Sequence, residues 1–116
     1  MKRGDVYWAS LSPRSGSEQS GRRPVVILSH DAFNQTKAWR SIIVVPLSTS
    51  AAQARRGPTV VALVAGTAGL PGESSVLCHQ VTTLDRSKLT EKIGALPADA
   101  LTLVEKALLS AVDIRA

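Results

Sequence analysis

The chain consists largely of short apolar runs, rich in β-branched residues and separated by polar or glycine-rich joints. Runs of this length bounded by turn residues are typical of β-strands. Six of them in 116 residues predict a mainly β fold, a small β-barrel. The predicted strands are DVYWASL, PVVILS, SIIVVPLS, TVVALV, SSVLCHQV and LTEKIGAL, at residues 5–11, 24–29, 41–48, 59–64, 74–81 and 89–96.

The hydrophobic period changes after Pro97. Apolar residues then recur at helical spacing, which predicts an amphipathic C-terminal helix. Asp99 falls in its first turn, where a carboxylate complements the positive end of the helix dipole. Glu105 and Lys106 are expected on the solvent face. The apolar positions are Leu101, Val104, Leu108, Ala111 and Val112.

The composition of the chain predicts how many domains it forms and in which cell compartment it works. With 44% hydrophobic and 20% charged residues, residues 1–116 are expected to form one domain around one core. No apolar run approaches the ~18 residues that span a bilayer, and no apolar segment follows the basic start as in a signal peptide. Cys78 is the only cysteine, which fits a reducing cytoplasm and predicts a buried, inert thiol.

The formal net charge is +5 and the isoelectric point is about 10.0. Lysine and arginine clearly outnumber acids in residues 1–56, whereas acids slightly outnumber them in residues 57–116. An anionic partner such as nucleic acid is therefore expected to bind the basic half. The alternative is a positive surface that serves only solubility.

Three long joints and one short helical turn connect the predicted strands. Residues 12–23 and 48–58 form polar loops of a length that is often functional. Residues 65–74 are predicted to form a mobile hairpin tip; their glycines do not make a phosphate loop, because no lysine follows at the required spacing. The stretch DAFNQ, residues 31–35, predicts a short helical turn capped by Asp31.

Conventional catalytic machinery is missing from the sequence. His30, His79 and Cys78 show no metal-ligand spacing. Cys78 and His79, as neighbours on one predicted strand, would point to opposite faces and could not act as a nucleophile and base pair. No paired carboxylates and no nucleophile elbow occur. We therefore expect neither a metal nor another cofactor.

Arginine next to hydroxyl groups suits a different chemistry. RNA can be cleaved without a metal, because the neighbouring 2′-hydroxyl is itself the nucleophile. The protein then needs to align the phosphate and stabilise the charge of the pentacoordinate phosphorane. An arginine fork can bind two phosphate oxygens at once, which makes it suited to this second task.

Several motifs in order carry a resemblance to a known family. The segment RGDVYWASLSPRSGSEQSGRRPVVILSHDAFN resembles the start of MazF/PemK toxins in its Gly-Asp-x-x-Trp strand, its Gly-Ser-Glu-Gln loop and its Arg-Pro-Val strand entry. VVPLSTS and HQVTTLDRSKL are similar to later family segments, and the C-terminal helix completes the match. The resemblance extends over essentially the whole chain.

This resemblance implies an SH3-like β-barrel of the MazF/CcdB type and a homodimer. It implies the toxin of a type II toxin–antitoxin system, inhibited by a cognate antitoxin protein. It also implies a sequence-specific endoribonuclease that cleaves single-stranded RNA without metal, leaving 2′,3′-cyclic phosphate and 5′-hydroxyl ends.

The resemblance also implies site residues. The catalytic cation would be Arg23, and the catalytic hydroxyl would be Ser48, where many relatives have threonine, with Thr49 as the alternative. Serine keeps the hydroxyl but lacks the methyl group that restricts the rotamer. Residues 16–21 would form a movable cover over the RNA. The residues expected to contact RNA are Glu18, Gln19, Arg22, Trp39, Arg55, Arg56 and Gln80.

Two other functions remain open at this stage. CcdB toxins, which poison gyrase, resemble the same barrel; they act through the last residues of the C-terminal helix, including a tryptophan that SAVDIRA lacks. The second alternative is a non-catalytic SH3-like module that binds RNA or a peptide. Neither the general base and acid nor the RNA motif follows from these residues.

Overall fold

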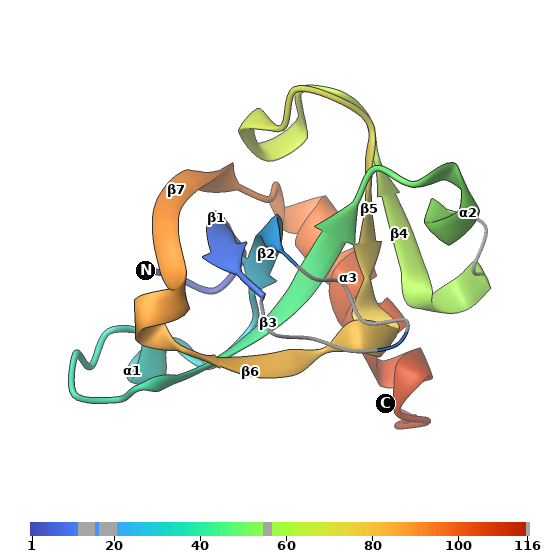
Figure 1. Ribbon diagram of the computed structural model, residues 1–116. Helices are drawn as coiled ribbons and strands as arrows, with labels where there is room; N and C mark the ends of the chain where they lie inside the picture. Colours follow the sequence, from blue (N-terminus) through green and yellow to red (C-terminus); the bar gives the residue numbers. More distant parts are fainter. Residues whose placement is uncertain (12–15, 17–20, 55–56, 116) are drawn as a thin grey trace.

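The computed structural model describes residues 1–11, 16, 21–54 and 57–115 (Figure 1). Within these residues the strands are β1 (Asp5–Ser10), β2 (Arg22–Ile27), β3 (Ser41–Ser48), β4 (Val60–Leu63), β5 (Ser74–Leu77), β6 (Thr82–Asp85) and β7 (Leu89–Ala95). The α-helices are α1 (Asp31–Asn34), α2 (Ala51–Ala54) and α3 (Ala98–Ala111). Short 3₁₀ turns cover Gly57–Thr59, Thr67–Gly69, Cys78–Gln80 and Arg86–Lys88.

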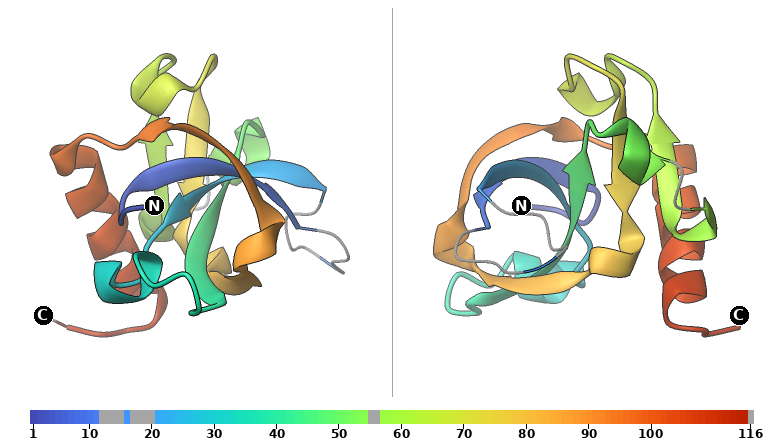
Figure 2. Two further views of the ribbon diagram at one scale, coloured as in Figure 1. Left: turned by 90° about the vertical axis from the view of Figure 1, so that its left-hand side faces the viewer. Right: turned by 45° about the vertical axis from the view of Figure 1, so that its right-hand side comes forward.

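The strands form one antiparallel sheet in the order β4-β5-β3-β2-β1-β7, with β6 also paired to β3. Strand β3 organises this sheet. Residues Ser41–Val44 pair with β6, residues Leu47 and Ser48 pair with β5, and the opposite edge pairs with β2. The sheet curls strongly, and α3 lies along its outside (Figure 2). This is the predicted small barrel with a C-terminal helix.

The central strands bury both of their faces. Val25 and Val44 belong to a core inside the curled sheet, whereas their neighbours Val26 and Val45 belong to a core under α3. Successive strand residues point to opposite faces, so a strand that is covered on both sides reads as a continuous apolar run. This is why PVVILS and the second half of β3 do not alternate with polar residues, whereas Ile43, nearer the start of β3, is 42% exposed.

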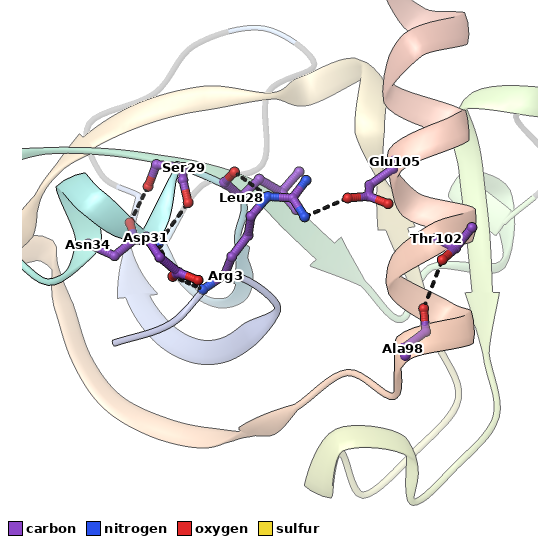
Figure 3. A network of polar contacts seen from close by, with 8 residues as sticks. All are labelled: Arg3, Leu28, Ser29, Asp31, Asn34, Ala98, Thr102 and Glu105. Carbon is purple, nitrogen blue, oxygen red and sulfur yellow. Dashed lines mark hydrogen bonds and ion pairs between the residues drawn. The ribbon is translucent and has the colours of Figure 1, made fainter. Parts of the chain in front are cut away.

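Helix α3 confirms the predicted period, and Lys106 lies on the solvent face as predicted, whereas Glu105 is partly covered. Val104 and Ala107 are buried, with 0% and 5% of their surface exposed. Glu105 is half-buried and forms an ion pair with Arg3, 2.5 Å from Nη1 to Oε2. The Arg3 side chain also donates to the Leu28 carbonyl at 3.1 Å, and the Arg3 backbone N–H donates to the Asp31 carboxylate (Figure 3). The N-terminus, α1 and α3 are thereby joined in one polar network.

The predicted strand over residues 74–81 is confirmed only as far as Leu77. Strand β5 ends at Leu77, a 3₁₀ turn covers Cys78–Gln80, and a separate strand, β6, follows. The turn shifts the chain from one half of β3 to the other, which a straight strand could not do. Cys78 and His79 therefore do not alternate along a strand, although Cys78 is buried as expected, with Sγ 3.6 Å from the Val104 carbonyl oxygen.

Three local predictions also need correction. Strand β2 begins at Arg22, two residues before the predicted run. The turn at α1 exists, but its cap is His30, whose Nδ1 accepts the Ala32 N–H at 2.9 Å. The 65–74 hairpin packs against β7: a Cβ on Gly94 would lie 2.2 Å from the Ala68 carbonyl oxygen. The glycine at position 94 thus allows this hairpin to dock.

Candidate functional site

Arg23 and Ser48 lie near each other on neighbouring strands. The pairing of β2 with β3 ends at Val25 and Pro46, and Arg23 and Ser48 each lie two residues beyond this pair. Both line a cavity of about 40 Å³ together with Pro24, Leu47, Thr49 and Ser74. The pairing of β2 with β3 thus brings together all three residues expected to be catalytic.

The orientation of Arg23 follows from its place in β2. Val25 and Ile27, two and four residues further on, point into the core inside the curled sheet. Arg23 shares their face, and it lies at the strand end, where its side chain is exposed. A strand held on both sides by β1 and β3 therefore carries a solvent-accessible cation at its rim.

Ser48 is buried and oriented by the backbone that follows it. Only 8% of its surface is exposed, and its Oγ accepts the backbone N–H of Ser50 at 3.0 Å. This hydrogen bond supplies a rotamer constraint that a threonine would obtain from its methyl group. Among the described residues no acceptor takes the Ser48 hydroxyl proton. The hydroxyl can therefore donate to a bound oxygen in the cavity, whereas Thr49 is exposed at its edge.

A larger cavity of about 400 Å³ adjoins the first and shares Ser48, Thr49 and Ser74 with it. Its lining residues come from the ends of β3 and β4, the start of β5 and α2. These elements lie side by side in the fold (Figure 1). Its other lining residues are Ser50, Ala54, Ala62, Leu63, Val64, Glu73 and Ser75. Sequence reasoning missed Glu73, Ser74 and Ser75, because their approach to Ser48 depends on the pairing of β3 with β5.

Of the expected RNA contacts that the structure describes, Arg22, Trp39 and Gln80 line neither cavity. The Arg22 guanidinium lies over the Trp8 ring, 4.2 Å from its centroid, and 3.5 Å from Glu91. Trp39 lies at the opposite end of β3, stacked on Phe33 with ring centroids 4.4 Å apart. Gln80 is half-buried in the 3₁₀ turn after β5. Glu18, Gln19, Arg55 and Arg56, like the rest of the cover loop except Gly16 and Gly21, lie outside the described residues.

In the described part of the chain, the groups with shifted pKa values, Asp31, Cys78 and Asp85, line neither cavity. Burial raises the pKa of Cys78 to about 12, and hydrogen bonds from Arg40 and Ser87 lower the pKa of Asp85. His79 lies with Nδ1 3.2 Å from the Thr59 hydroxyl. No three metal-ligating side chains gather within the described ranges, and no helix there is long and apolar enough to span a bilayer.

Comparison with known proteins identifies relatives of similar length. The chain is 38% identical to endoribonuclease EndoA of Bacillus subtilis over 108 residues, which cover 93% of this chain and 90% of EndoA. It is 34% identical to endoribonuclease MazF6 of Mycobacterium tuberculosis over 114 residues, 98% of each chain.

Solved structures share the fold. The crystal structure of MazF from Deinococcus radiodurans matches with a TM-score of 0.80 and 32% identity, covering 97% of this chain and 96% of that one. A mycobacterial endoribonuclease in complex with its cognate antitoxin matches with a TM-score of 0.79 and 26% identity, covering 100% and 98%. The family model of PemK-like, MazF-like toxins spans residues 2–112, and the chain therefore belongs to this family of type II toxin–antitoxin toxins.

Proposed function

We propose that this protein is an endoribonuclease toxin that cleaves single-stranded RNA at the cavity of Arg23 and Ser48, without a metal. The observation that carries the proposal is that an exposed arginine and an oriented serine hydroxyl, on adjacent strands, line the same cavity. The names of the relatives, endoribonucleases EndoA and MazF6, support it.

The geometry suggests how the reaction proceeds. The ribose 2′-oxygen attacks the neighbouring phosphorus, the bond from phosphorus to the 5′-oxygen breaks, and a 2′,3′-cyclic phosphate and a 5′-hydroxyl result. The 2′-hydroxyl loses its proton and the leaving oxygen gains one. Arg23 keeps its charge and binds two phosphate oxygens through its planar fork. The Ser48 hydroxyl accepts the Ser50 N–H and donates a hydrogen bond to a phosphate oxygen.

The remaining expected contacts would guide RNA towards this cavity. Arg22 would contact phosphate from the outer face, next to Trp8. The stacked pair of Trp39 and Phe33 would bind bases that extend past the start of β3. Gln80 would contact the RNA between these two sites. Glu18 and Gln19 would contact RNA from the cover loop. Arg55 and Arg56 would add positive charge that attracts the RNA.

We also propose the assembly in which the toxin works. A cognate antitoxin would bind over the RNA path, and two copies of the chain would form a homodimer. Leu103 on α3 and Ile114 beyond it are 53% and 57% exposed, which gives the dimer apolar surface to cover. Residues 1–116 would act as one toxin domain in the cytoplasm, where RNA is available and Cys78 stays reduced.

Incubation of purified protein with end-labelled single-stranded RNA in excess EDTA tests the activity. We expect discrete fragments whose 3′ ends carry a cyclic phosphate. A protein that binds the RNA and leaves it intact would be a binding module instead. Cleavage that requires Mg²⁺ would contradict the proposed chemistry.

A further inference from the structure

The cavity next to Ser48 contains a carboxylate that the cleavage chemistry does not use. We propose that this cavity holds a nucleobase flanking the scissile phosphate and that Glu73 reads it, selecting amino-bearing bases against uracil. The inference rests on the proposed RNA cleavage. It adds a specificity-determining residue to that reaction.

The position of the cavity favours a nucleotide as its occupant. Because it shares Ser48, Thr49 and Ser74 with the Arg23 cavity, a nucleotide whose phosphate contacts Arg23 has adjoining space for its base. A volume of about 400 Å³ lies within the range of small-ligand pockets. The hollow arises from small side chains in register across three strands: Ser48 pairs with Ser75, and Ser75 pairs with Ala62. On the other face of the same strands, Leu47, Val76 and Val61 fill the core under α3.

Glu73 differs from the other described carboxylates. Asp31, Asp85 and Asp99 accept backbone or side-chain hydrogen bonds, and the rest form ion pairs with Lys or Arg. No described residue forms an ion pair or hydrogen bond with Glu73. Glu73 is exposed, so water solvates it in the free protein. When RNA is bound, a carboxylate beside the phosphate site repels it unless the ligand donates a hydrogen bond to the carboxylate. The place of Glu73 in the lining therefore favours a base that carries an N–H donor.

The chemistry of the bases decides which of them Glu73 accepts. An ionised carboxylate is only an acceptor. Adenine, cytosine and guanine carry an exocyclic amino group on the edge that proteins read in single strands. Uracil offers one N–H between two carbonyl oxygens, and these oxygens would repel the carboxylate. The hydroxyls of Thr49 and Ser75, which also line the cavity, can donate to acceptor atoms of the same base.

The test is a cleavage profile on an RNA library of random sequence, in EDTA, with the 5′-hydroxyl fragment ends sequenced. Wild type is expected to exclude uracil at one position flanking the cut. Glu73→Gln and Glu73→Ala are expected to reduce that discrimination about tenfold while they still cut, because Arg23 and Ser48 are unchanged. The matched control is Asp99→Asn, an exposed carboxylate in the first turn of α3 that lines neither cavity and should reproduce the wild-type profile.

The outcomes separate this inference from the function on which it rests. A wild-type enzyme that cuts but accepts uracil freely at both flanking positions would overturn the base assignment. Glu73 variants with an unchanged profile, folded by circular dichroism, would overturn the role of Glu73 and leave the ribonuclease activity standing. A wild type that cuts no RNA in the library would overturn both proposals.

Discussion

Arg23 is the residue on which the proposed chemistry most depends. Its fork can bind two phosphate oxygens, and a lysine at the same position would present a single point charge. Arg23→Lys should therefore fold normally, since the side chain is exposed, and lose cleavage by about 100-fold or more. Single-turnover cleavage rates measure the loss. If the Arg23→Lys variant cleaves RNA within a fewfold of the wild-type rate, the fork has no role.

Arg22 provides the contrast at the neighbouring position. Because its guanidinium stacks on Trp8 on the outer face, Arg22→Gln, which removes the positive charge, should weaken RNA binding and reduce its salt dependence, with the chemical step preserved.

Ser48 combines a structural bond with the proposed catalytic one. Ser48→Ala should slow cleavage strongly, and it should also destabilise the fold by ~1 kcal/mol, because the Ser50 N–H loses its acceptor. Ser48→Thr should retain activity, since threonine keeps the hydroxyl. Cleavage rates and urea unfolding separate the two effects. If alanine is harmless at position 48 but damaging at position 49, Thr49 is the catalytic hydroxyl.

Cys78 should be unreactive in the folded protein. Burial raises its pKa from 9.0 to about 12, so the folded state keeps the proton that the unfolded chain releases. Its contribution to stability is therefore full below pH 9 and declines as the pH rises from 9 towards 12. A thiol reagent at about pH 8, where a free thiol is partly ionised, should label Cys78 in urea and leave it unlabelled without denaturant. Rapid labelling of the native protein would contradict its burial.

At the scale of elements, Arg86 holds the connection between α1 and β3. Its guanidinium donates to the carbonyls of Phe33, Asn34, Thr36 and Trp39, at 3.0–3.1 Å. Arg86→Ala should lower the free energy of unfolding by ~2 kcal/mol, since these carbonyls lose a charged donor. Denaturant unfolding of the variant and the wild type measures this difference in the free energy of unfolding. Lys37→Ala, an exposed change in the same connection, serves as the control and should be neutral.

The consequences of Arg86→Ala should stay local to that end of β3. The Arg23 and Ser48 cavity lies at the other end of the strand, so cleavage of a short RNA should persist in the folded variant. If the variant loses activity only towards long RNA, the Trp39 and Phe33 pair binds RNA. If it loses activity equally towards short and long RNA, Arg86 also stabilises the cavity of Arg23 and Ser48.

At the scale of the whole molecule, the proposed dimer and the proposed inhibition are linked. The net charge of +5 favours binding of an acidic antitoxin segment as well as of RNA. A segment that becomes ordered on binding can block the RNA path. We expect a dimer by sedimentation and full inhibition by one cognate antitoxin segment per site. Leu103→Glu should weaken the dimer without unfolding the chain, because Leu103 is exposed. An active strict monomer, or a complex that still cuts RNA, would contradict this arrangement.

The features of this protein that depend on local periodicity follow from the amino-acid sequence alone. Runs such as PVVILS are apolar throughout because both strand faces are covered, and α3 repeats its buried positions at the helical period because one side packs on the sheet. Arg23 and Ser48 follow instead from the family resemblance, whose motifs each lie within one continuous segment.

Which segments meet depends on the tertiary structure. The turn at Cys78–Gln80 and strand β6 exist because β3 pairs with two different strands along its length, and no local pattern reports this. Glu105 meets Arg3 across 102 positions, and Glu73 approaches Ser48 through the pairing of β3 with β5. Such contacts depend on the register between distant segments. That register is set by the packing of the whole barrel, because a slip of one residue would turn every buried side chain to the opposite face.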